Sequence, residues 1–136
     1  MAQHVDMNGL WTGTYAYDLI DDRVAFTAWF DDQNGTLGGT ITEPNTFVSN
    51  GPDELDAIIK GSRHGILIDF IKSYSKNSGV HQSAIYYEGE SNPDFTRVSG
   101  IWRFQARDVM SGTFTLSRIS HGMEKAAKRR VETVER

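Results

Sequence analysis

Between Gly9 and Ile119, apolar and polar residues alternate with a period of two along most of the chain. Such alternation is typical of strands that bury one face and expose the other. Runs rich in threonine, isoleucine and aromatic residues are separated by turn residues at fairly regular spacing. The pattern predicts strands at Leu10–Tyr17, Arg23–Asp31, Thr36–Glu43, Leu55–Arg63, Ile66–Tyr74, Gln82–Gly89, Thr96–Phe104 and Ser111–Ile119.

The links between these runs carry residues that suit turns. Asn34–Gly35 is a pair that favours a two-residue hairpin, because both residues tolerate a positive φ angle. His64–Gly65 and Lys76–Gly79 predict further hairpin tips. The prolines also fall between predicted strands, where no N–H is needed for the ladder: Pro44, Pro52 and Pro93.

The strand pattern also limits the topology. No long helical pattern occurs between Gly9 and Ile119, so consecutive strands are expected to pair antiparallel. An open meander would leave unpaired strand edges, which a barrel or a sandwich protects. Short links favour the barrel. The expected fold class is therefore all-β, an eight-stranded antiparallel up-and-down β-barrel with a short C-terminal helical tail.

The chain divides into three predicted segments. Residues 1–8 are expected to form a flexible N-terminus and residues 9–120 the barrel. Residues 121–136 are richer in basic side chains, and their apolar residues recur at helical spacing in a thin stripe. We expect a basic tail that is helical or disordered.

Composition narrows the class of protein. A chain of 136 residues with 38% apolar and 24% charged residues fits one globular domain. It has no run of ~20 apolar residues and no secretory-signal pattern, so membrane insertion is not expected. The chain has no cysteine, which excludes disulfides and suits a cytoplasmic protein. A net charge of −4 opposes nucleic-acid binding, because phosphate backbones are repelled.

Patterns that would indicate catalysis or metal binding are missing. The four histidines lie at predicted termini or turns, without the spacing of a metal site. No G-x-S-x-G nucleophile motif occurs. Residues 32–43 match several oxygen positions of a calcium loop, but Leu37 stands where that loop needs glycine. We expect no enzyme activity, no metal and no cofactor.

Alternation predicts a strongly aromatic barrel interior. In the first strand Trp11, Tyr15 and Tyr17 share one face, and threonines occupy the other. In the seventh strand Trp102 lies on the same face as Gly100, which is expected to leave room beside the indole. An interior of this kind can fill with side chains or hold one small ligand. The predicted ligand contacts are Tyr15, Tyr17, Glu43, Phe70, Tyr86 and Trp102.

Two short motifs carry a resemblance to a known group. Gly9–Trp11 in the first strand, with Arg118 at the end of the last, resembles the signature of the calycin barrels, which include lipocalins, fatty-acid-binding proteins and avidins. The resemblance implies that the tryptophan packs under the arginine and closes one barrel end. Gly35–Thr42 is similar to the third-strand G-x-L-x-G-T pattern of avidins. Gly13 and Tyr17 stand where avidins present small polar biotin contacts, so biotin binding is not implied.

Two classes of function follow from this barrel. The first is non-catalytic binding of a small, partly apolar or aromatic ligand inside it. The second is a homo-oligomeric interaction module whose barrel is filled and holds no ligand. A barrel enzyme ranks third, because the sequence shows no positioned acid–base pair. A cavity would favour the first class, and a filled barrel the second.

Overall fold

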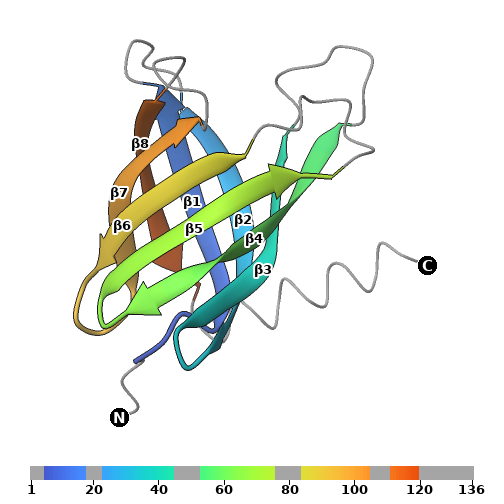
Figure 1. The fold of residues 1–136 in the computed structure, drawn as a ribbon. Helices are drawn as coiled ribbons and strands as arrows, with labels where there is room; N and C mark the ends of the chain where they lie inside the picture. Colours follow the sequence, from blue (N-terminus) through green and yellow to red (C-terminus); the bar gives the residue numbers. More distant parts are fainter. Residues whose placement is uncertain (1–4, 18–22, 45–52, 76–83, 105–110, 120–136) are drawn as a thin grey trace.

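The computed structural model describes residues 5–17, 23–44, 53–75, 84–104 and 111–119. These residues form eight antiparallel strands that close into one barrel in sequence order (Figure 1). The predicted fold class, an all-β up-and-down barrel, is confirmed. The strands are β1 (Gly9–Tyr17), β2 (Arg23–Gln33), β3 (Thr36–Pro44), β4 (Glu54–His64), β5 (Leu67–Tyr74), β6 (Ile85–Ser91), β7 (Arg97–Phe104) and β8 (Ser111–Arg118).

Each observed strand corresponds to a predicted one, and the differences lie at strand ends. Asn34 and Gly35 have φ angles of 54° and 96°, as the predicted hairpin requires. Pro44 is the last residue of β3, whereas the sequence placed it just after the strand. The predicted hairpin tip at 76–79 and the predicted tail at 121–136 lie outside the described residues.

Closure joins the first strand to the last. β1 pairs with β2 on one side and with β8 on the other, so the sheet keeps no unpaired edge. Trp11 and Tyr15 of β1 are buried in the interior, while Thr12 is exposed. The predicted inside/outside pattern of β1 is therefore correct. No helix among the described residues is long and apolar enough to cross a membrane.

One end of the barrel, which we call the closed end, carries the three short turns between β2 and β3, β4 and β5, and β6 and β7 (lower end in Figure 1). Trp11 is fully buried there, and the Arg118 guanidinium lies 4.5 Å from its ring centroid. The predicted Trp11–Arg118 contact is confirmed. The Trp11 indole N–H donates to the carbonyl of Met7 at 2.9 Å, and Met7 is also fully buried. The packed end thus begins before the predicted boundary at Gly9.

The opposite end, which we call the far end, contains the last residues of β1, β3, β5 and β7. The links from these strands to the next ones (18–22, 45–52, 76–83 and 105–110) are outside the described residues. Between the two ends, aromatic rings fill the middle of the barrel. Phe70 stacks on Tyr87 with centroids 4.8 Å apart, and Phe114 meets Tyr87 edge-on at 5.0 Å.

Candidate functional site

A buried ion pair lies inside the barrel. Glu43 of β3 and Lys72 of β5 both point inward, and the Lys72 Nζ donates to Glu43 Oε1 at 2.7 Å. The Lys72 and Glu43 side chains are 1% and 0% exposed. β4 lies between their strands in the sheet, so the pair reaches across the interior rather than along a ladder. Among the described residues, Glu43 and Lys72 are the most deeply buried polar ones, with 1% of each whole residue exposed.

Tyrosines surround this ion pair. The Tyr15 hydroxyl donates to Glu43 Oε2 at 2.6 Å, and the Tyr74 hydroxyl donates to the same oxygen at 3.1 Å. Lys72 Nζ lies 4.8, 4.7 and 5.6 Å from the ring centroids of Tyr15, Tyr74 and Tyr87, within the range of cation–π attraction. We call these five residues the interior polar cluster. Among the described residues, no buried side-chain nitrogen or oxygen lacks a hydrogen-bond partner.

Burial keeps the tyrosines of the cluster protonated. It raises the pKa of Tyr74 to about 12, even though the positive charge of Lys72 opposes the rise. Burial also raises the pKa of Tyr15 and Tyr87 well above the ordinary value, and the negative charge of Glu43 adds to both effects. These hydroxyls therefore act as hydrogen-bond donors rather than as bases at neutral pH.

A group of aromatic side chains lies on the far-end side of the cluster. The Trp102 ring meets Tyr15 and Tyr17 edge-on, with centroids 6.0 and 5.1 Å apart, and tilts against Phe104 at 5.9 Å. Trp102 itself is buried, while Tyr17 and Phe104 are half-buried. The indole N–H donates to the Ala16 carbonyl at 3.1 Å. We call Tyr17, Trp102 and Phe104 the aromatic rim.

The glycine beside the Trp102 indole is Gly112, not Gly100. Gly112 is the β8 partner of Trp102, and a Cβ there would lie 2.7 Å from the indole Nε1. A Cβ on Gly100 would instead meet the backbone carbonyl of Glu88 at 2.0 Å. The predicted role of Gly100 was therefore wrong, because the indole leans toward the neighbouring strand. The indole occupies the space that the absent Gly112 side chain leaves.

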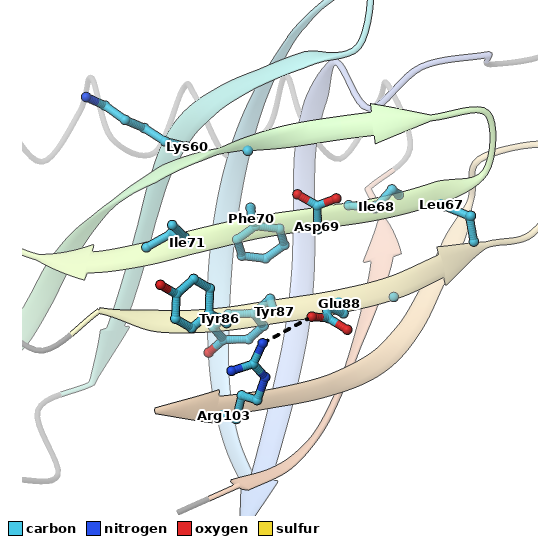
Figure 2. Close-up of a pocket in the computed structure, with 12 residues that line it drawn as sticks. Lys60, Leu67, Ile68, Asp69, Phe70, Ile71, Tyr86, Tyr87, Glu88 and Arg103 are labelled. Atoms are coloured by element: carbon cyan, nitrogen blue, oxygen red, sulfur yellow. Dashed lines mark hydrogen bonds and ion pairs between the residues drawn. The ribbon is translucent and has the colours of Figure 1, made fainter. Parts of the chain in front are cut away.

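Most of the predicted contact residues share the interior. Tyr15, Glu43, Phe70 and Trp102 are buried there, and Tyr17 lies at its far end. Tyr86 does not join them. Figure 2 shows it on the outer face of β6, where the Arg103 guanidinium lies 4.9 Å from its ring centroid.

The placement of Tyr86 corrects the sequence interpretation. Two tyrosines stand side by side in this strand, and only one can face inward. Tyr87 is the inward one, because it pairs with inward-facing Trp102 on β7 and Phe70 on β5. Lys72 and Tyr74, which also face the interior, were not among the predicted contact residues. Strict alternation from Phe70 would have placed both of them inside.

Two hollows on the outer face of the barrel are lined by described residues. One, of about 500 Å³, lies over β4–β7, and its margin carries Tyr86, Arg103 and Glu88 (Figure 2). Arg103 and Glu88 form an exposed ion pair of 3.5 Å there. The other, of about 440 Å³, lies mainly over β8, β1, β2 and β3, and five of its twelve lining residues are threonines.

The described residues contain no group of three or more His, Cys, Asp or Glu side chains that could hold a metal ion. No protein-family model, curated protein or solved structure matches the chain. The geometry of the barrel is therefore the basis for any functional assignment.

Proposed function

We propose that the chain binds a small, partly apolar or aromatic molecule without catalysis, in the far-end half of the barrel interior. The observation that carries this proposal is the Glu43–Lys72 ion pair, set inside the barrel with tyrosyl hydroxyls on the carboxylate. The closed-end half is packed by side chains such as Trp11, Phe30 and Leu116. We therefore place the ligand in the half that contains the interior polar cluster and the aromatic rim; both hollows described above lie on the outer face, so side chains of the rim have to move to admit it.

The energetics of a buried ion pair support a role in binding. Two charges removed from water lose hydration, and apolar side chains of similar volume often stabilise a core equally well. A barrel interior that only had to be filled would gain little from Glu43 and Lys72. A ligand with one polar group would use them, since the Lys72 ammonium, the Glu43 carboxylate and the tyrosyl hydroxyls converge on one place inside the barrel.

The aromatic rim supports the apolar part of the ligand. Tyr17, Trp102 and Phe104 present ring faces and edges beside the cluster. A planar or aliphatic group packed against them would leave its polar end directed at Lys72 or Tyr74. Ligand sites of this composition, apolar with a few convergent polar groups, are typical of small-molecule binding.

The protonation and hydrogen bonding of the tyrosines in the interior polar cluster argue against acid–base catalysis. A general acid or base works best with a pKa near the operating pH. The hydroxyls of Tyr15 and Tyr74 have raised pKa values through burial and donate to Glu43. Binding without reaction fits that arrangement better.

We further propose that the barrel is calycin-like. The support is the Trp11 indole under the Arg118 guanidinium at the closed end. Arg118 also donates hydrogen bonds to the carbonyls of Phe95, Asn8 and Asp6, so one side chain ties three segments together.

The experiment combines native mass spectrometry of freshly purified protein with fluorescence titrations of aromatic and lipid-like compounds. We expect a retained small mass or a saturable shift in tryptophan emission. Trp102→Phe should largely abolish that shift, and Lys72→Met should weaken binding. Trp29→Phe is the matched control, because Trp29 lies on the outer face and is 38% exposed.

The proposal fails if the full chain carries no small molecule and no compound gives a saturable change. It also fails if Trp29→Phe, rather than Trp102→Phe, removes the fluorescence response, since binding would then lie outside the barrel. A folded Lys72→Met variant with unchanged affinity would remove the interior polar cluster from the site.

A further inference from the structure

Charged side chains are segregated on the outer face of the barrel. On the outward face of β8, β1, β2 and β3, the described charged residues are Arg23 and Asp31, near opposite ends of β2. The outward face of β4–β7 carries many more, including Lys60, Asp69, Glu88, Glu90, Arg97 and Arg103. In a chain with 24% charged residues, this difference between the two halves is large.

Threonines dominate the uncharged half, which we call the threonine face. Its members on the four strands are Thr12, Thr14, Thr27, Thr36, Thr40, Thr42, Thr113 and Thr115. The Thr14 and Thr115 hydroxyls lie 3.2 Å apart across β1 and β8. Depletion of charge is the compositional mark of the buried centre of a protein–protein interface.

The threonine face carries one exposed indole, that of Trp29, and one hollow. Trp29 of β2 is 38% exposed, and its strand partners on either side are Leu10 and Thr40. The hollow of about 440 Å³ begins two residues along the same strand, at Thr27. Two acidic residues line it: Glu54 of β4, and Glu43, whose side chain points into the barrel. An exposed indole thus lies directly beside an almost uncharged hollow large enough to receive one.

We propose that the threonine face is an interface between two copies of this chain, related by a two-fold axis, with Trp29 of each copy seated in the hollow of the other. In an isologous interface the same patch serves both copies, so a projecting residue and its receiving hollow must lie on one face. Tryptophan is also the residue type most enriched among interface residues with large energetic effects.

The size and charge of the face fit a second copy of the chain. Four strands spaced by about 4.8 Å and about eight residues of about 3.3 Å each span roughly 500 Å². Stable interfaces begin at about 600 Å² per partner and weak, transient ones are smaller, so the area of this face fits a weak dimer. Packing it against itself would bury no row of like charges. The mixed charges on β4–β7 would remain in water.

Sedimentation velocity of the full chain between about 1 and 100 µM tests this interface, because it spans the range of weak dimers. We expect a dimer in this range. Thr27→Arg and Trp29→Ala should each weaken dimerisation at least about tenfold, by adding a charge to the hollow or removing the indole. Leu67→Arg on β5 is the control, since Leu67 is 57% exposed and neither neighbour of β5 belongs to the threonine face. It should leave the dimer unchanged.

Thermal melts at the lowest concentration establish that each variant is folded. A chain that stays monomeric at about 100 µM overturns the proposal. So does a dimer that Leu67→Arg disrupts and Thr27→Arg leaves intact. Loss of ligand binding in the barrel would not affect either result, because the threonine face and the interior polar cluster lie on opposite sides of the sheet.

Discussion

Glu43 and Lys72 form a 2.7 Å ion pair across the barrel interior, although β4 separates their strands. Neither side chain has access to water, so each charge depends on the other and on the tyrosines around them. The pair ties β3 to β5 through the inside of the barrel. Its presence in an otherwise aromatic interior needs a physical explanation, and its energetics can be measured.

Removing one member of the pair should destabilise the fold strongly. Lys72→Met leaves the Glu43 carboxylate buried without its cation, which costs about 3–5 kcal/mol of unfolding free energy. The double variant Glu43→Leu/Lys72→Met should lose less than the sum of the single variants, because no unpaired charge remains. Urea denaturation of the three variants measures the coupling. Simple additivity would mean that the two side chains act independently.

The exposed Arg103–Glu88 pair provides the control. Its side chains are 52% and 57% exposed, and the closest atoms are 3.5 Å apart. Water screens such a pair, so Arg103→Met should change the unfolding free energy by less than about 1 kcal/mol. A loss comparable to that of Lys72→Met would contradict the role of burial in the first prediction.

The closed end should depend on Trp11. Its indole is fully buried, packs edge-on against Phe30 and donates to the Met7 carbonyl. Trp11→Ala should therefore cost about 3–5 kcal/mol, as for other buried aromatic truncations. Arg118→Lys keeps the charge but loses the planar contact with the indole, so it should cost a measurable part of that amount. A loss below about 1 kcal/mol for Trp11→Ala in denaturant melts would show that this end does not hold the barrel together.

The fold was predictable because most of its strands follow one simple rule. In β8, Gly112, Phe114 and Leu116 face inward and alternate with exposed serines and threonines. The pairing register follows from this alternation, since a shift of one residue would turn Phe114 and Leu116 into water. The hairpin between β2 and β3 was predictable too, because Asn34 and Gly35 tolerate the positive φ angles that its turn requires.

The site was less predictable, because charged residues stand at inward positions that ordinarily hold apolar side chains. Lys72 breaks the apolar pattern of β5, and a lysine in a strand is ordinarily assigned to the surface. Only contacts between distant strands show that Glu43 of β3 and Tyr15 of β1 meet it inside. Tyr86 and Tyr87 posed the opposite difficulty, since adjacent aromatics fit either orientation until β6 is paired with β7.

A third prediction concerns Asp32, which is buried at the closed end. Burial raises its pKa, but the Arg63 guanidinium and the backbone N–H groups of Met7 and Gly35 hold it below the ordinary value of 3.8. The unfolded chain therefore binds this proton at a higher pH than the folded chain does. The stabilisation from Asp32 is present above pH 3.8 and is lost as the pH falls through the folded pKa.

Asp32→Asn should remove this acid-dependent part of the stability. The variant is expected to be less stable than the wild type at neutral pH, because an amide gives up the charge-assisted bond to Arg63. The difference between the two proteins should then shrink below pH 3.8. Urea melts at a series of pH values provide the measurement. A difference that stays constant down to the acid limit would contradict the assignment.

The fourth prediction is a loss of stability in alkali, caused by the tyrosines of the interior polar cluster. Tyr74 ionises at about pH 10 in the unfolded chain, whereas burial raises its pKa to about 12 in the fold. Between these values the unfolded chain binds fewer protons, so unfolding becomes more favourable as the pH rises. This difference of about two pKa units corresponds to a loss of about 3 kcal/mol in unfolding free energy between pH 10 and pH 12.

The raised pKa values of Tyr15 and Tyr87 should extend this decline to higher pH. Tyr74→Phe has no hydroxyl to ionise, so its stability should fall less steeply between pH 10 and 12 than that of the wild type. Denaturant melts give the slope, and tyrosinate absorbance shows whether ionisation of the buried rings coincides with unfolding. Equal slopes for the two proteins would mean that Tyr74 ionises as easily in the fold as in the unfolded chain. The hydrogen bond from Tyr74 to Glu43 makes that outcome hard to accommodate, because an ionised Tyr74 would place a second negative charge beside the carboxylate.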